Sequence, residues 1–218
     1  MNSLKIGILS IQGDIEENSS AVKESLLELE TEGQIVHLKN TLGIEELHGL
    51  VIPGGESTVM GMLLSLQKIQ LELLIKKINE GLPVLGTCAG LILLARNAHD
   101  KTIGETKQQL LQTLDVTVER NSFGRQRDSF EADLEVPMLG KEPFKGVFIR
   151  GPAITDVGKN VQILTKFGNK VVAVRQDNII ATSFHPELAN DNRFHKAFLS
   201  ICIRYCKSKE SGRDQLKS

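Results

Sequence analysis

Short apolar runs that stop at glycine-containing turns constrain the fold of this sequence more than any other feature. The first run, at residues 6–11, is short and shows no alternation of polar and apolar residues, which is typical of a strand buried on both faces. A helical pattern with Val22, Leu26 and Leu29 on one side follows the first run, and a second strand pattern comes next. A strand–helix–strand order predicts a largely parallel sheet with right-handed crossovers. The apolar runs lie at residues 6–11, 50–52 and 84–85, and the second strand pattern lies at residues 34–38.

The second half of the sequence has a different texture. Residues 114–119 and 130–136 alternate between apolar and polar side chains, and further short runs are separated by turn pairs such as Gly-Asn at 168–169. This pattern predicts added antiparallel strands, whereas residues 97–109 are expected to form a polar connection. The expected fold class is therefore α/β, with a mostly parallel central sheet flanked by helices and antiparallel strands added in the second half.

Length and charge limit the domain organisation and the partners. A chain of 218 residues favours one domain, which we place at residues 1–206. A last helix is expected at about residues 192–205, and the charged, Ser-rich residues 207–218 are predicted to form a disordered tail. Lys and Arg number 26 against 27 Asp and Glu, so the formal net charge of −1 gives no electrostatic footprint for nucleic acid or an anionic membrane.

The cysteines bear on the compartment. Three Cys fit no disulfide framework, and the sequence shows neither a signal-peptide pattern nor an apolar run of about 18 residues that would span a bilayer. We therefore expect a cytoplasmic protein. In that reducing compartment, a Cys with a particular role is expected to be catalytic and not part of a structural disulfide. Cys202 and Cys206 lie one turn apart with His195 on the same expected helix, but they lack enough ligands for a metal site and are interpreted as buried apolar thiols. No metal is expected.

The sharpest candidate for chemistry is Gly-Thr-Cys-Ala-Gly at residues 86–90, between a buried strand and an apolar helix. A nucleophile on such a strand-to-helix turn projects clear of the sheet, and flanking glycines relieve the crowding of the turn. A nearby helix N-terminus favours the thiolate of Cys88, and the backbone N–H of Ala89 is a candidate oxyanion donor. The alternative is that Cys88 is a small buried apolar residue.

A base and its orienting group are offered by Ser-Phe-His-Pro-Glu at residues 183–187, where another strand pattern ends. An activated Cys needs a base such as His185, and the base needs an orienting carboxylate such as Glu187. Taken alone, the motif also fits a surface His beside a solvated Glu. Combined with an elbow Cys in a parallel sheet, it predicts a Cys–His–Glu triad.

A third motif, Pro-Gly-Gly-Glu-Ser at residues 53–57, follows the strand pattern at 50–52. Ligands of open α/β sheets bind beyond the carboxyl ends of the strands, which is also the edge expected for Cys88. Glycine allows close approach of backbone N–H groups, so Gly54 or Gly55 could complete an oxyanion hole. A simple tight turn is the alternative.

Taken together, these motifs resemble those of class I, or triad, glutamine amidotransferases. More narrowly, the chain is similar to the glutaminase subunits of the two-component pyridoxal 5′-phosphate synthases, in the family's order from residue 9 to residue 188. The matching segments are Leu-Ser-Ile-Gln-Gly at 9–13, Pro-Gly-Gly-Glu-Ser-Thr at 53–58, Gly-Thr-Cys-Ala-Gly-Leu at 86–91, Arg-Asn-Ser-Phe-Gly-Arg-Gln at 120–126, Phe-Ile-Arg-Gly-Pro at 148–152 and Ser-Phe-His-Pro-Glu-Leu at 183–188.

The resemblance implies roles for particular residues. It implies that Cys88 is the nucleophile, His185 the general base and acid, and Glu187 the group that orients it. Gly151 departs from the family's pattern, which has Ala there, and adds backbone freedom to that segment. The glutamine pocket implied by the resemblance is lined by Gly55, Glu56, Ser57, Arg120, Ile149 and Arg150.

The implied reaction also calls for a partner. A γ-glutamyl thioester forms on Cys88, ammonia leaves, and water releases glutamate. Free ammonia is protonated in water, and the chain has no residues left for a second domain, so the acceptor site is expected on another protein. By resemblance that partner is the synthase subunit, which would dock near Gln12 and the turn at residues 54–55 and raise a low glutaminase activity. Pyridoxal phosphate would be the product of the complex, and no cofactor is expected on this chain.

Three other interpretations remain open at the level of sequence. The same triad could supply ammonia to another synthase, although residues 87–89 and 120–126 argue against that. A Cys peptidase or glyoxalase-like hydrolase could share the sheet, but it would not need the His-Pro-Glu motif at residues 185–187. A binding module that senses glutamine without cleaving it would not need an intact triad.

Overall fold

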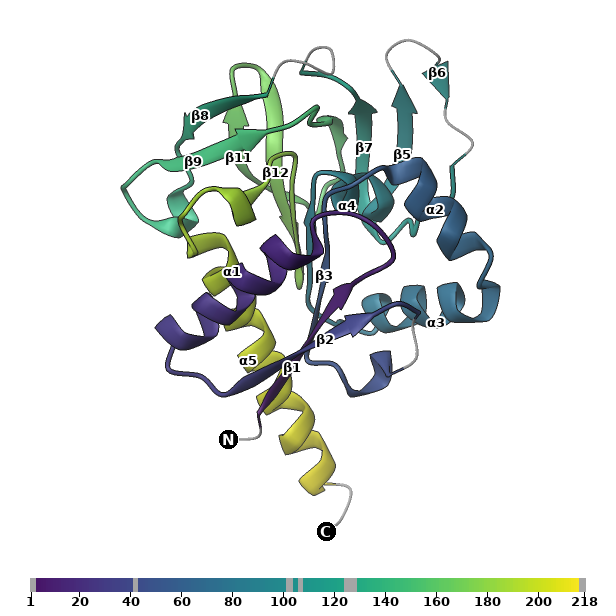
Figure 1. The fold of residues 1–218 in the computed structure, drawn as a ribbon, viewed down its shortest axis with the longest axis vertical. Coiled ribbons are helices and arrows are strands. Elements are labelled where there is room, and N and C mark those ends of the chain that lie inside the picture. The colour runs from purple at the N-terminus through teal and green to yellow at the C-terminus, as the bar shows by residue number, and fades with distance from the viewer. Residues whose placement is uncertain (1–2, 41–42, 101–103, 106–107, 124–128, 216–218) are drawn as a thin grey trace.

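Parallel strands form the centre of the sheet (Figure 1). β1 (Leu4–Leu9) lies between β2 (Gly33–Leu38) and β3 (Gly49–Ile52), and the sheet continues from β3 to β4 (Val84–Thr87) and then to β13 (Ile179–Thr182). All of these neighbours pair in parallel, as the strand–helix–strand order predicts. This computed structural model describes residues 3–40, 43–100, 104–105, 108–123 and 129–215.

Helices cover both faces of these strands. α1 (Ile15–Glu28) and the long α5 (Arg193–Gln215) pack against each other on one face. α2 (Ser57–Ser65), α3 (Lys68–Asn79) and the short α4 (Ala89–Leu94) lie on the other face. Short 3-10 turns complete the connections at Ile44–Glu46, Pro137–Leu139 and Pro186–Leu188.

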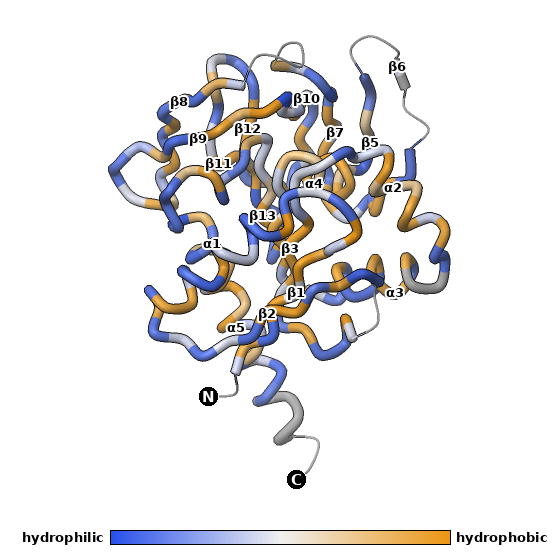
Figure 2. Tube along the Cα trace, in the orientation of Figure 1, coloured by the Kyte–Doolittle hydropathy of each residue, from blue (hydrophilic) through white to orange (hydrophobic). Residues whose placement is uncertain are grey.

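The alternation of side chains in each strand explains why both faces need cover. In β3, Leu50 and Ile52 point into the core shared with α2, α3 and α4, whereas Val51 points into the core shared with α1 and α5. All three side chains are fully buried. The apolar colour of the central strands in Figure 2 shows the same property. A strand with two buried faces reads as a continuous apolar run, which is why the sequence shows no alternation there.

Antiparallel strands extend the sheet beyond β13. β12 (Lys170–Gln176), β10 (Ala153–Val157) and β7 (Leu114–Arg120) follow in that order and pair in antiparallel fashion. β5 (Ala95–Asp100) then pairs in parallel with β7, and β6 (Gly104–Glu105) pairs with β5. The predicted mixture of a parallel centre with antiparallel additions is therefore confirmed.

A hairpin and one further strand complete the β structure. β8 (Phe130–Leu134) pairs with β9 (Phe144–Phe148) in a separate two-stranded sheet, and β11 (Gln162–Phe167) pairs with β12. Phenylalanine rings join this hairpin to the rest of the core. The ring of Phe148 stacks on Phe130 and lies edge-on to Phe184, which directly precedes the candidate base.

Two boundaries differ from the sequence analysis. The prediction of a polar connection at residues 97–109 was wrong for its beginning, because β5 runs to Asp100 through backbone pairing with β7. Within β5 only the small side chains of Ala95 and Ala98 are buried, so the sequence contains no apolar run that would have predicted this strand. The last helix continues past residue 205 to Gln215, into the segment predicted as a disordered tail.

Two local side-chain contacts lie within the longer part of this helix. Lys209 places its ammonium 4.5 Å from the centre of the Tyr205 ring, and Ser211 donates to the carbonyl of Lys207 one turn back. Residues 216–218 lie outside the described part of the chain, and the domain boundary at residue 206 stays a prediction. None of the helices in the described ranges has the length and the apolar character needed to cross a bilayer.

Candidate active site

The candidate nucleophile occupies a sharp turn between β4 and α4. Cys88 has φ 49° and ψ −100°, in the left-handed region that favours glycine. A Cβ on Gly90 would lie 2.0 Å from the carbonyl oxygen of Ile52, and one on Gly86 would lie 2.5 Å from Leu94 Cδ1. Gly90 therefore lets the turn pack tightly against β3, and Gly86 makes room for α4, as the elbow interpretation requires.

The sulfur of Cys88 lies at the carboxyl edge of the parallel strands. The Cys88 backbone N–H donates to the carbonyl of Thr182 in β13 at 2.8 Å, which fixes the elbow against that strand. Its side chain is 7% exposed, and Sγ lies 3.8 Å from the carbonyl oxygen of Ile149. A buried thiol at this edge can meet a substrate only through the adjoining cavity.

The candidate base follows β13 and reaches the same edge. Its backbone is fixed, because the N–H of His185 donates to the carbonyl of Val147 at 2.8 Å. The ring nitrogen Nδ1 lies 2.9 Å from Glu187 Oε1, and the Glu187 side chain is completely buried. Burial lowers the pKa of His185, but hydrogen bonds with Asp14, Cys88 and Glu187 outweigh it and raise the pKa to about 12.

A second carboxylate beside His185 was missed by the sequence analysis. Asp14 Oδ2 lies 3.2 Å from the same Nδ1 atom. The sequence signal for Asp14 was its position in the Gln-Gly-Asp turn at residues 12–14, which follows the first strand. Because the carboxyl ends of parallel strands meet at one edge of the sheet, this turn lies at the same edge as His185. Nδ1 and the oxygens of Asp14 and Glu187 lie within 4.8 Å of one another, a spacing that a cation could also use. Nδ1 is at hydrogen-bond distance from both oxygens. A proton on Nδ1, shared between the two carboxylates, therefore explains why the three groups lie together.

The Gly-Gly turn after β3 packs against both the base and the first loop. A Cβ on Gly54 would lie 2.4 Å from His185 Cε1, so only glycine fits beside the ring. Gly55 has φ 156°, and the next N–H, that of Glu56, donates to Gln12 Oε1 at 2.8 Å. The side chain of Gln12 thus holds the turn from which an oxyanion donor is expected.

Charged groups line the far side of the site. Glu56 caps α2, since its carboxylate accepts from the N–H groups of Thr58 at 3.1 Å and Val59 at 2.7 Å. Burial raises the pKa of Glu56, but these backbone hydrogen bonds outweigh it, so the pKa lies below its usual value. Arg120 Nη2 lies 3.3 Å from Glu56 Oε1, and its Nη1 donates to Gln108 Oε1 at 3.0 Å.

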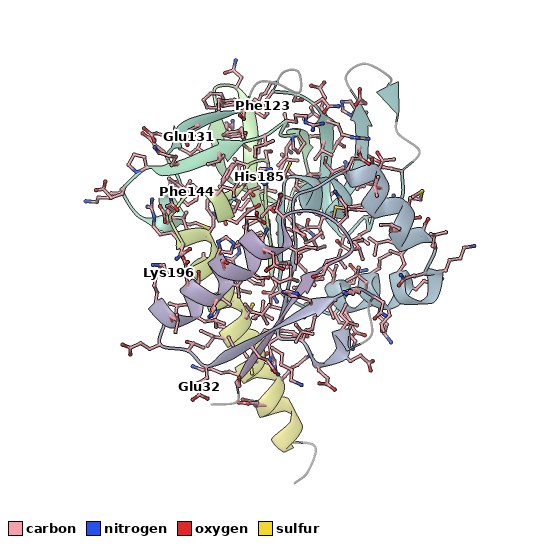
Figure 3. The ribbon with its side chains drawn as sticks, viewed as in Figure 1. Glu32, Phe123, Glu131, Phe144, His185 and Lys196 are labelled. Atoms are coloured by element: carbon pink, nitrogen blue, oxygen red, sulfur yellow. The ribbon has the colours of Figure 1, made fainter. Side chains whose placement is uncertain are left out.

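A cavity of about 320 Å³ brings most of the predicted residues together. In Figure 3, His185 lies in the upper half of the molecule, well above Glu32, which precedes β2. Glu187 is the predicted residue that does not line the cavity, because it stands behind His185. The lining residues are Gln12, Asp14, Gly55, Glu56, Ser57, Cys88, Ala89, Ile92, Arg120, Asn121, Ile149, Arg150 and His185.

Two other cavities lack the candidate catalytic residues. Two cavities of about 260 and 300 Å³ lie at the opposite edge beside Cys206, and neither is lined by a predicted site residue. Cys202 is fully buried, and burial raises the pKa of both thiols. The His195 ring is also fully buried, and burial lowers its pKa to about 4. These three side chains pack in the core around α5.

Comparisons with known proteins agree with this geometry. A family model described as the SNO glutamine amidotransferase family matches residues 8–204. The pyridoxal 5′-phosphate synthase subunit PdxT of Nitrosopumilus maritimus is 47% identical over 199 residues, which cover 91% of this chain and 97% of that protein. PdxT of Staphylothermus marinus is 45% identical over 205 residues, which cover 92% of this chain and 100% of that protein.

Solved structures give the same picture. A crystal structure of a glutamine amidotransferase is 41% identical, with a TM-score of 0.77, and the match covers 90% of this chain and 98% of that one. A putative GMP synthase subunit from Thermoplasma acidophilum is 18% identical with a TM-score of 0.62, which shows the shared fold alone. Of the segment at 120–126 that indicated the narrower family, residues 124–126 lie outside the described part of the chain, as does Arg127.

Proposed function

Since the chain belongs to the SNO glutamine amidotransferase family, we propose that Cys88, His185 and Glu187 are its catalytic triad in a pyridoxal 5′-phosphate synthase. The chain is a glutamine amidotransferase that releases ammonia from glutamine for a separate synthase subunit. The observation that carries the assignment of residues is the convergence of Cys88 and His185 on one cavity, with Glu187 Oε1 2.9 Å from the imidazole.

In the proposed mechanism, the Cys88 thiolate attacks the side-chain carboxamide carbon of glutamine. The oxyanion is held by the N–H groups of Gly55 and Ala89, and loss of either donor is expected to cost roughly 100- to 1000-fold in turnover. The imidazolium of His185 gives its proton to the departing nitrogen, so the C–N bond breaks and ammonia leaves. A γ-glutamyl thioester remains on the sulfur.

The second half of the reaction needs His185 as a base. Neutral imidazole takes a proton from water, the hydroxide attacks the thioester carbon, and the C–S bond breaks to give glutamate and the thiolate. Glu187 accepts a hydrogen bond from Nδ1–H throughout, which leaves Nε2 as the nitrogen that exchanges protons with the substrate. The His185 Nε2 atom is buried, and Cys88 is among the groups that interact with the ring and raise its pKa, consistent with that role.

Glutamine recognition is assigned to the charged far wall of the cavity. The α-carboxylate of glutamine needs a guanidinium or N–H donors, and its ammonium needs a carboxylate. Glu56 and Arg120 supply both signs within 3.3 Å of each other, and Ser57, Ile149 and Arg150 line the same cavity. A cavity of about 320 Å³ suits a single amino acid.

The partner is assigned to the mouth of this cavity. Ammonia released into water would be protonated and lose its nucleophilicity, so the synthase subunit must cover the exit. An exposed apolar stripe on α2 starts next to the cap residue Glu56, with Val59, Met62 and Leu66 being 37%, 54% and 74% exposed. We place the contact on this stripe and on the adjoining turns that hold Gln12 and Gly54.

The cytoplasm is the proposed compartment. Cys88, Cys202 and Cys206 are all free thiols, and a reducing environment keeps the nucleophile available. Pyridoxal 5′-phosphate is the product of the complex in this proposal.

The test is glutamate release from glutamine by the purified chain, alone and with the synthase subunit, with Cys88→Ala as the control. The proposal expects the partner to raise the activity and Cys88→Ala to abolish it. Glutamine that remains intact under both conditions would contradict the proposal and favour a sensor that binds glutamine without cleaving it.

A further inference from the structure

We propose that Asp14 is a second positioning residue for His185, which holds the ring as imidazolium and so favours thioester formation over thioester hydrolysis. This inference rests on the proposed function of His185. It concerns a residue outside the triad, contributed by the loop between β1 and α1. Three independent features of Asp14 support it.

The first feature is an N-cap residue that does not cap. Asp14 occupies the N-cap of α1, where an Asp side chain usually accepts a hydrogen bond from the first turn. Its side chain makes no such bond and places Oδ2 3.2 Å from His185 Nδ1. The carboxylate is thus directed to the imidazole at the expense of its usual role in the helix.

The second feature is a pair of glycines that bring the two loops together. The Asp14 N–H donates to the carbonyl of Gly54 at 3.1 Å, and a Cβ on Gly13 would lie 1.7 Å from that same oxygen. A Cβ on Gly54 would lie 2.4 Å from His185 Cε1 and 2.5 Å from Asp14 Oδ2. Side chains at these positions would separate the carboxylate from the ring.

The third feature is the charge around the ring. Glu187 faces His185 from its own segment, Asp14 from the β1–α1 loop and Cys88 from the elbow. Burial lowers the pKa of His185. Among the contacts that raise it, the hydrogen bond with Asp14 has the largest effect. Across the cavity, the charged residues are Glu56, Arg120 and Arg150.

Two carboxylates on one imidazole have opposite effects on the two half-reactions. The imidazolium stabilises the Cys88 thiolate and carries the proton that ammonia takes, so both carboxylates favour formation of the thioester. Hydrolysis of the thioester needs the neutral ring as a base, which the same carboxylates disfavour. Asp14 therefore adds to acylation and slows deacylation.

The test isolates the ring from the sulfur. In a Cys88→Ala chain labelled with [15N]histidine, the NMR titration of His185 is compared with and without Asp14→Asn up to pH 11. Removing one carboxylate is expected to lower the midpoint by about one pH unit or more. The Asp14 side chain makes no cap hydrogen bond, and its pairing with the imidazolium stabilises the folded chain, so Tm at neutral pH is expected to fall together with the midpoint. Glu16→Gln, an exposed acid on the first turn of the same helix, is the matched control.

The pH dependence of glutaminase activity provides a second test of the role of Asp14. With Cys88 intact and the synthase subunit present, Asp14→Asn is expected to move the alkaline limb of kcat/KM for glutamine to lower pH, while Glu16→Gln leaves it in place. Equal His185 titrations in the two Cys88→Ala chains, including a ring that stays protonated to pH 11 in both, would overturn the inference. A lower Tm with an unchanged titration would reduce Asp14 to a structural residue. Absence of glutaminase activity in the wild-type complex would instead contradict the proposed function, and the titration would still decide the role of Asp14.

Discussion

The elbow at Cys88 predicts that glycine is better tolerated there than at an ordinary buried position. Its φ of 49° and ψ of −100° lie where a side chain is strained and glycine is not. The perturbation is a pair of substitutions, Cys88→Ala and Cys88→Gly, which differ by one methyl group. Both remove the sulfur, so their difference reports the backbone.

The magnitude follows from the geometry. A non-glycine residue in a sparsely populated backbone region costs about 1–3 kcal/mol. At a regular buried helical position, replacing Ala by Gly instead costs about 1 kcal/mol of helix propensity and about 0.8 kcal/mol for the lost methyl group. Ala21 in α1, which is 5% exposed, is such a position and serves as the control through Ala21→Gly.

The assay is thermal and urea-induced unfolding of the wild type and the three variants. Cys88→Gly is expected to be at least as stable as Cys88→Ala, whereas Ala21→Gly loses about 2 kcal/mol, or roughly 4–8 °C in Tm for a chain of this size. An equal loss from Ala to Gly at both positions would refute the idea that the elbow stores strain at Cys88.

Three further predictions concern other parts of the molecule. Gly90→Ala forces α4 away from the Ile52 carbonyl, 2.0 Å from the added Cβ, and should abolish glutamine hydrolysis and lower Tm measured by calorimetry. His195 has a folded pKa of about 4 against 6.5 when unfolded, so stability should fall by up to about 3 kcal/mol as pH drops from 6.5 to 4; His195→Leu should flatten that dependence in urea titrations. Met62→Glu should reduce activation by the synthase subunit at least tenfold in kinetic assays, whereas Leu27→Glu, at an exposed site on α1, should not.

The sequence was most informative where burial and chain geometry leave a clear pattern. The apolar runs predicted the parallel strands because strands buried on two faces contain few polar residues. The motifs around Cys88 and His185 predicted their meeting, because the carboxyl ends of parallel strands share one edge of the sheet. The structure brings both to one cavity with Gly55 and Arg120.

Other features depended on contacts between distant segments. β5 is held by backbone pairing with β7 and carries polar side chains at Arg96, Asn97 and His99, so its sequence resembles a loop. Asp14 looked like an ordinary turn residue, because its approach to His185 depends on the packing of two loops that are far apart in the sequence. Such contacts become visible only when the fold is known.

The central claim is that glutamine is cleaved through a thioester on Cys88. The most direct measurement is an acid quench of the complex during turnover with isotopically labelled glutamine, followed by peptide mapping with mass spectrometry. We expect a γ-glutamyl group on the peptide that carries Cys88, and we expect hydroxylamine to release it. Steady release of glutamate with no label on Cys88, or with label on another residue, would contradict the account.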